Sequence, residues 1–174
     1  MHVKFIGAIA GLLLLVGCTS NIQEIKTAEG TGDAYSKALT DQYKAFVVEL
    51  TNAYDWSHAD YFAQKGLSAA KGEDVPPEDV AKWKVMDSSK DDLNTARKSL
   101  MAALDGGARE SKPDLAAKAQ VRFDCWVLDA YEGNLPHVST YTYEDSSYDT
   151  SHENPYIVYA CKSAFQSDLA ALQK

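Results

Sequence analysis

The residues of this chain best suited to chemistry are its three cysteines, Cys18, Cys125 and Cys161. A thiol can be acylated, can form a disulfide, or can act as a nucleophile when a base lies beside it. Cys18 follows a short polar start with one lysine, the apolar run Phe5–Val16 and the small residue Gly17. This order is typical of a secretory signal. The apolar run is much shorter than the roughly 20 residues of a membrane-spanning helix, which disfavours an uncleaved anchor.

The segment that ends at Cys18, Leu15-Val16-Gly17-Cys18, resembles the bacterial lipobox. The resemblance implies that the Cys18 thiol receives a diacylglyceryl group and that a signal peptidase removes residues 1–17. A plain secretory signal would instead end in two small residues spaced by one, and Leu15 does not fit that pattern. Thr19, not aspartate, follows Cys18, which by the sorting rule of enteric bacteria favours the outer membrane. The resemblance therefore implies a lipid anchor in the cell outer membrane and a domain that faces the periplasm.

The composition describes an acidic chain with material for one core. It has 174 residues, of which 25 are acidic and 17 basic, and a net charge of −8. Such a charge repels phosphate backbones, so we expect no nucleic-acid partner. Residues 18–32 are polar and end in Gly30-Thr31-Gly32, so they are predicted to be a lipidated, flexible tether. Residues 33–174 are predicted to form a single helical domain.

Apolar residues recur at steps of three and four along most of this domain. The pattern predicts an all-α fold of about five helices in antiparallel hairpins. Asp33 is a plausible N-cap for the first helix, and Pro113 suits the first turn of the fourth. Trp83 is expected to pack the connection between the second and third helices onto the first hairpin. The predicted helices cover residues 33–54, 57–71, 88–104 and 113–132, and a last helix begins at Pro155.

Cys125 and Cys161 remain as an even pair in an exported chain, which predicts one disulfide. Cys161 lies in the apolar stripe of the last helix, so the bridge would fasten that helix to the fourth. The alternative is two buried free thiols, because cysteine also behaves as a small apolar residue.

A long segment rich in tyrosine, threonine and serine separates the last two helices. Tyr141, Tyr143 and Tyr148 are candidate protein-contact residues, because tyrosine combines a large contact area with a polar tip. The alternative is that these rings fold back over the last two helices. The piece Val138–Tyr143 has the composition of a short strand.

Several short motifs resemble the N-terminal region of OmpA-family lipoproteins of Gram-negative bacteria, and the first predicted hairpin resembles a tetratricopeptide pair. The family implies a helical periplasmic module joined to a peptidoglycan-binding domain. This chain ends at Lys174 without room for that domain, so we expect no direct peptidoglycan binding. The motifs are the lipobox, Tyr54-Asp55-Trp56, Tyr61-Phe62-Ala63-x-Lys65-Gly66-Leu67, Pro76-Pro77-Glu78, Gly107-Ala108-Arg109, and Phe123-Asp124-Cys125-Trp126 with Cys161.

Metal and cofactor chemistry find little support in the residue spacing. After the signal, the chain has three histidines, His58, His137 and His152. None of them has a metal-ligating residue four positions later on a predicted helix. The acidic stretch from Asp145 to Asp149 resembles a calcium loop, but it lacks the glycine and the final glutamate that an EF-hand requires. We therefore expect no metal site and no cofactor.

Enzymatic motifs are equally sparse. The chain has no nucleophile elbow and no glycine-rich phosphate loop. The carboxylates Glu73, Asp74, Glu78 and Asp79 have the residue types of an acid–base pair, but nothing in the sequence marks them as buried. The sequence thus favours a non-enzymatic, outer-membrane-anchored lipoprotein that acts as an envelope scaffold or protein-interaction module. The alternative is a periplasmic lipoprotein that binds a small ligand or inhibits an enzyme.

Overall fold

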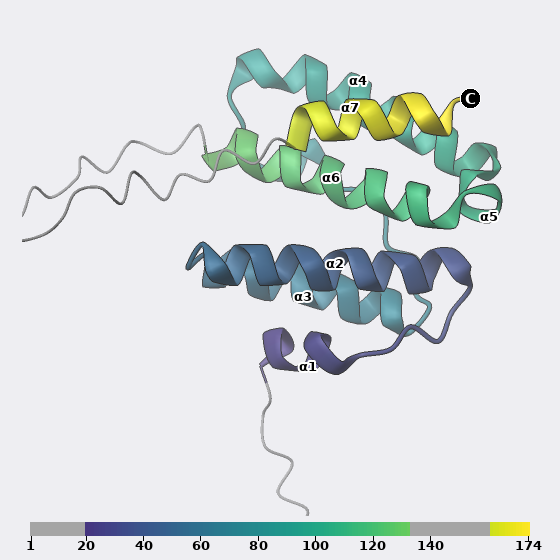
Figure 1. Ribbon diagram of the computed structural model, residues 1–174. Coiled ribbons are helices and arrows are strands. Elements are labelled where there is room, and N and C mark those ends of the chain that lie inside the picture. Colours follow the sequence, from purple (N-terminus) through teal and green to yellow (C-terminus); the bar gives the residue numbers. More distant parts are fainter. Residues whose placement is uncertain (1–19, 133–160) are drawn as a thin grey trace, which may run out of the picture.

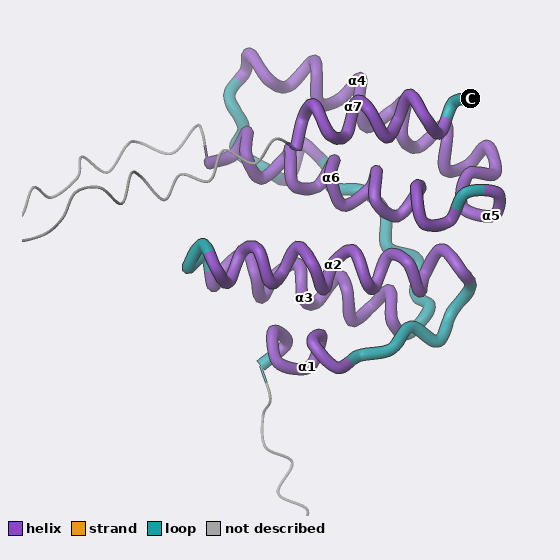
Figure 2. Tube along the Cα trace, in the orientation of Figure 1, coloured by secondary structure: helices purple, strands orange, loops and turns teal. Residues whose placement is uncertain are grey.

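The computed structural model describes residues 20–132 and 161–174, and this part of the chain is all-α (Figure 1). The predicted fold class is confirmed. Figure 2 shows helices joined by mostly short connections, with no strand among the described residues. The helices are α1 (Asn21–Thr27), α2 (Ala34–Asn52), α3 (Trp56–Ala70), α4 (Asp87–Ala103), α5 (Arg109–Ser111), α6 (Pro113–Glu132) and α7 (Cys161–Leu172), with a 3-10 turn η1 (Val80–Lys82) and a π-turn η2 (Leu104–Ala108).

The helices form two layers (Figure 1). Helices α1, α2 and α3 make one layer, and α4, α6 and α7 make the other. Helix α2 packs on both α3 and α6, so it joins the layers through the core. Large side chains such as Phe62, Phe123 and Leu100 are fully buried between these helices.

The first hairpin follows from its caps and its apolar stripe. The Asp33 side chain accepts a hydrogen bond from the Ser36 backbone N–H at 2.7 Å, which confirms it as the N-cap of α2. Asp55 caps α3 in the same way by accepting from the His58 N–H at 3.2 Å. Between the two helices Tyr54 adopts a left-handed backbone with φ 61°. The predicted hairpin is therefore confirmed to within a few residues at each end.

The flexible tether predicted over residues 18–32 is wrong for Asn21–Thr27, which form α1. Ile22 and Ile25 of this helix are buried against the hairpin. Gly66 makes the approach possible, because a Cβ there would lie 2.8 Å from Cδ1 of Ile25. The Thr31 N–H then donates to the Ala70 carbonyl at 2.8 Å and fastens the connection to α2.

The second layer contains the predicted disulfide. Cys125 of α6 and Cys161 of α7 are bonded, with their Cα atoms 5.8 Å apart. Phe165 of α7 packs beside them against Phe123 and Trp126. The fourth predicted helix matches α6, whereas the predicted start of the last helix at Pro155 lies outside the described residues.

None of the helices that the structure describes has both the length and the apolar composition needed to cross a bilayer.

Candidate functional site

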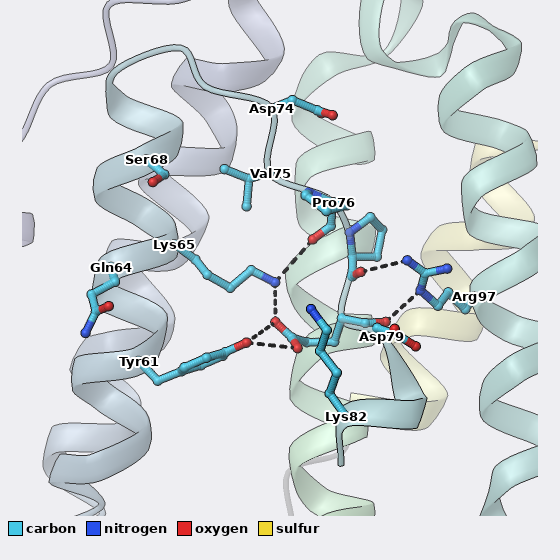
Figure 3. A pocket seen from close by; sticks show the side chains of 12 residues that line it. Tyr61, Gln64, Lys65, Ser68, Asp74, Val75, Pro76, Asp79, Lys82 and Arg97 are labelled. Carbon is cyan, nitrogen blue, oxygen red and sulfur yellow. Dashed lines mark hydrogen bonds and ion pairs between the residues drawn. The ribbon is translucent and has the colours of Figure 1, made fainter.

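The segment 75–78, between α3 and η1, is clamped by side chains from three helices. Gln120 of α6 donates to the Val75 carbonyl at 2.7 Å, and Lys65 of α3 donates to the Pro76 carbonyl at 3.2 Å. Arg97 of α4 donates to the carbonyls of Pro77 and Glu78 at 3.2 and 2.7 Å (Figure 3). Four consecutive carbonyls thus have side-chain donors.

The two prolines explain why this segment is extended. Proline has no N–H, and it disfavours the helical conformation in the residue before it. Pro76 and Pro77 therefore leave no backbone donor in need of a partner, while their carbonyls accept from Lys65 and Arg97. A short extended segment can lie between helices on these terms without unsatisfied backbone groups.

A buried ionic cluster lies under the segment and consists of Lys65, Glu78 and Asp124. The Lys65 ammonium donates to the Glu78 carboxylate at 2.5 Å and to the Asp124 carboxylate at 2.7 Å. The side chains are 13%, 4% and 0% exposed, respectively. Three charges buried from water are stable only when each is paired and hydrogen-bonded. The other contacts of the two carboxylates therefore decide whether the cluster is structural or has a free position for chemistry.

Neutral donors complete the buried ionic cluster. Asp124 also accepts from the Tyr43 hydroxyl at 2.6 Å and from the Glu78 N–H at 2.8 Å. Glu78 accepts from the Tyr61 hydroxyl at 3.0 Å and from the Trp83 indole N–H at 2.8 Å. The two carboxylates are therefore saturated by protein donors, as expected of a structural cluster.

The structure confirms the prediction that Trp83 packs the connection between α3 and α4 onto the first hairpin. Its ring contacts His58, Tyr61 and Phe62 on α3 and Tyr131 on α6. Its N–H bonds Glu78, so the same residue packs the connection and supports the buried ionic cluster.

Burial and charge together set the protonation of the cluster. Burial alone would lower the pKa of the Lys65 ammonium, but the carboxylates of Asp124 and Glu78 outweigh burial and raise it. Burial raises the pKa of the Asp124 carboxyl against the attraction of Lys65, and the charge of Glu78 acts in the same direction as burial. Burial is also the main cause that raises the pKa of Tyr35 and Tyr61 to about 12.

These shifts predict that the fold loses stability at alkaline pH. Tyrosines of the unfolded chain ionise near pH 10, whereas Tyr35 and Tyr61 stay neutral in the folded protein until about pH 12. The folded state then holds more protons, so stability present below pH 10 falls as the pH rises toward 12. At the largely buried Tyr35, a pKa raised from 10 to about 12 corresponds to about 3 kcal/mol of stability. The raised pKa of Lys65 acts in the same direction, since the folded protein keeps this ammonium to a higher pH than the unfolded chain does.

Circular dichroism and tyrosinate absorbance, recorded together across this range, test the alkaline transition. We expect some tyrosines to ionise only as the helical signal is lost, and Tyr35→Phe to reduce the stability lost between pH 10 and 12. If every tyrosine ionises near pH 10 while the helices persist, the assignment of buried phenols is wrong.

An open groove of about 460 Å³ lies over the clamped segment (Figure 3). Its floor contains Glu78 and Lys65, while Asp79 and Lys82 are exposed beside it. Of the four carboxylates considered from the sequence, Glu73, Asp74 and Asp79 are exposed and only Glu78 is buried. The lining residues are Tyr61, Gln64, Lys65, Ser68, Asp74, Val75, Pro76, Pro77, Glu78, Asp79, Lys82 and Arg97.

A second, smaller cleft of about 270 Å³ has the disulfide in its wall, together with Phe46 of α2 and Arg122 of α6. Burial raises the pKa of the Glu49 carboxyl beside it, against the charge of Arg122. In the described part of the chain, the side chains close enough to share a metal ion are Cys125, Asp129 and Cys161. The two cysteine sulfurs are bonded to each other and offer no thiolate, so this group does not constitute a metal site in the oxidised protein.

The predicted site residues fall into two groups. Cys125 and Cys161 are described and form the disulfide. Cys18 and the candidate contact residues Tyr141, Tyr143 and Tyr148 lie outside the described residues, as do His137 and His152. His58 lies at the start of α3, where its ring nitrogen Nδ1 is 2.7 Å from the carboxylate of Asp55.

Sequence reasoning missed the buried ionic cluster. One signal was present in α6, where Asp124 stands among the apolar residues Phe123, Cys125 and Trp126 and one turn after Gln120. An acidic residue inside an apolar stripe requires a buried partner. The partner could not be named, because Lys65 and Glu78 carry no local sign of burial.

Comparison with protein-family models, curated proteins and solved structures finds no match to this chain. The family resemblance of the short motifs therefore stays a prediction.

Proposed function

We propose that this chain is a lipid-anchored protein of the cell outer membrane that binds another envelope protein through the open groove. The observation that carries the proposal is a preorganised surface. Segment 75–78 is held by Lys65, Arg97 and Gln120, so the floor of the groove is fixed before any partner arrives. Preorganised surfaces bind without the cost of ordering a loop.

The shape of the groove favours a protein partner over a small ligand. Sites for small molecules are concave, mostly apolar and enclose most of the ligand. This groove is open, and its exposed residues Asp74, Asp79 and Lys82 are charged. Charges of both signs suit an extended polar segment of a partner, and periplasmic ligand binding or enzyme inhibition is the alternative.

The chemistry of the floor argues against an enzyme. A catalytic acid or base needs a free position for the reacting proton. Glu78 already accepts from Lys65, Tyr61 and Trp83, and Asp124 lies beneath it with no exposed surface. These carboxylates are better suited to holding the groove than to reacting in it.

Attachment to the membrane rests on the lipobox-like segment and Cys18. Each buried methylene contributes about 0.8 kcal/mol, so two or three acyl chains on one cysteine anchor a domain firmly. Because α1 begins at Asn21, the folded domain starts three residues after the acylated position.

Site-specific photocrosslinking in cells tests the proposed binding surface. A benzophenone amino acid replaces Gln64, an exposed groove residue, and in a matched control it replaces Gln166, which is exposed on α7 away from the groove. We expect a reproducible protein adduct in the membrane fraction from position 64 and not from position 166. The charge reversal Lys82→Glu should weaken that adduct, since Lys82 is exposed and lines the groove.

Equal adducts at both positions, or none at position 64, would contradict the groove as an interface. Palmitate labelling of the same cells reads the anchor independently. Cys18→Ser should abolish the label, and a label that persists in this variant would overturn the proposed lipid attachment.

A further inference from the structure

The turn between α2 and α3 places two aromatic side chains in solvent. Tyr54 is 79% exposed and Trp56 is 57% exposed, the highest values among the large apolar side chains that the structure describes. Asp55 between them is occupied with capping α3 and contacting His58. An exposed aromatic pair of this kind has no role in the core.

Tyr54 is held in this place against its backbone preference. Its φ of 61° lies in the left-handed region, which costs a residue with a Cβ roughly 1–2 kcal/mol relative to a helical conformation. Glycine would relieve that strain at the turn. Strain of this kind is concentrated at functional sites, and an exposed aromatic ring that carries it is suited to contact a partner outside the domain.

The folded domain begins beside this turn. The Asn21 side chain donates to the Asp60 carboxylate at 3.0 Å, which fixes the start of α1 on α3. Asp60 follows Trp56 by four residues and so lies on the same face of α3, about 6 Å further along the axis. Cys18 precedes Asn21 by three residues, and three residues span at most about 11 Å. The acylated position is therefore within reach of the aromatic turn.

We propose that Tyr54 and Trp56 insert into the bilayer interface beside the acylated Cys18 as a second, non-covalent membrane contact. The inference rests on the proposed lipid anchor and goes beyond it. Tyrosine and tryptophan favour the membrane–water interface, because one end of each ring system is apolar and the other is polar. The chain has a net charge of −8, so anionic headgroups do not attract it. We therefore expect the contact to form with zwitterionic lipid.

This contact orients the domain with respect to the membrane. Gln64, on the groove, follows Trp56 by eight residues on the same helix, a distance of about 12 Å along the axis. With Trp56 in the headgroup region, the groove opens near the membrane surface. A partner held there is itself a membrane protein or lies on the membrane.

Quenching of tryptophan fluorescence by lipid tests the contact. The mature lipidated protein is purified from membranes and reconstituted into phosphatidylcholine vesicles whose acyl chains carry bromine. The chain has three tryptophans, of which Trp126 is buried and Trp83 is half-buried. We expect a quenched component that is lost in Trp56→Phe, and protection of the same component from aqueous acrylamide.

Variants of Tyr54 separate contact from folding. Tyr54→Gly relieves the backbone strain, so it should fold at least as stably as the natural protein while the quenching of Trp56 falls. Tyr54→Phe, which keeps the ring, should retain more of the quenching than Tyr54→Gly. Quenching that is equal in all three proteins would remove Tyr54 from the proposed contact.

The intact mass of the same samples distinguishes the two proposals. Lipid mass on Cys18 with an unquenched, acrylamide-accessible Trp56 overturns this inference and leaves the anchor in place. A sample without lipid mass overturns the anchor and the inference together. A photocrosslinker at position 56 that captures protein instead of phospholipid assigns the turn to a protein interface and also overturns the inference.

Discussion

Lys65→Met should lower the free energy of unfolding by about 3–5 kcal/mol, the range observed when one partner is removed from a buried ion pair. Methionine fills similar space but supplies no charge and no donor. Glu78 and Asp124 then face each other in a site where they are 4% and 0% exposed. Domains of this size are stable by about 5–15 kcal/mol, so the loss removes a large part of the total.

Urea unfolding followed by circular dichroism measures this effect. Lys44→Met is a matched control, because Lys44 pairs with Asp41 at 3.3 Å on the outside of α2, where the carboxylate side chain is 71% exposed. Exposed pairs of this kind contribute about 0.5 kcal/mol or less. A loss at Lys65 no larger than the loss at Lys44 would show that the buried ionic cluster is dispensable.

The effect should extend to the groove, because the buried ionic cluster joins elements that are far apart in the chain. The Tyr43 hydroxyl of α2, the Lys65 ammonium of α3 and the backbone N–H of Glu78 each donate a hydrogen bond to Asp124 of α6. In the Lys65→Met variant, segment 75–78 also loses the hydrogen bond from Lys65 to the Pro76 carbonyl. The structural role of the cluster and the binding role proposed for the groove therefore depend on the same side chains.

Helix positions were largely predictable, because they depend on local pattern. The stripe of α6 and its opening Pro113 predicted the helix with its observed bounds, and Asp33 was recognisable as a cap. The disulfide followed from the even number of cysteines that remain in a chain predicted to be exported. Local signals of this kind need no knowledge of what lies across the core.

Other features were not predictable, because they depend on contacts between distant segments. Helix α1 has seven residues and buries only Ile22 and Ile25, too few to establish a period. Its position depends on the space that Gly66 leaves forty-one residues after Ile25, and that fit is invisible in the sequence. Likewise, the sequence does not distinguish the buried Glu78 from the exposed carboxylates near it. Its burial depends on contacts with Lys65 and Asp124, which lie in α3 and α6.

Removing the disulfide should lower the free energy of unfolding by about 4 kcal/mol. The bridge closes a loop across 36 positions, and the chain-entropy relation assigns a loop of this length that stabilisation. The change is the double variant Cys125→Ala with Cys161→Ala, measured by urea unfolding. The natural protein with reductant should approach the same value, while reductant should leave the double variant unchanged.

The other contacts of α7 determine whether the loss of stability arises in the folded or in the unfolded state. Phe165 packs on Phe123, Arg122 bonds the Asp168 carboxylate at 2.5 Å, and Lys112 donates to the Ala171 carbonyl at 2.9 Å. These contacts need no disulfide, so α7 should stay docked in the native state. The loss then acts through the unfolded chain, which becomes less compact, and the slope of the urea transition should increase.

Function should separate from stability in the double variant. No residue of α7 lines the groove, and the clamps on segment 75–78 come from α3, α4 and α6. Crosslinking from position 64 should therefore persist without the disulfide under conditions where the domain is folded, whereas Lys65→Met should weaken it. A partner adduct that disappears with the disulfide alone would move the interface to the cleft beside Cys125 and Cys161.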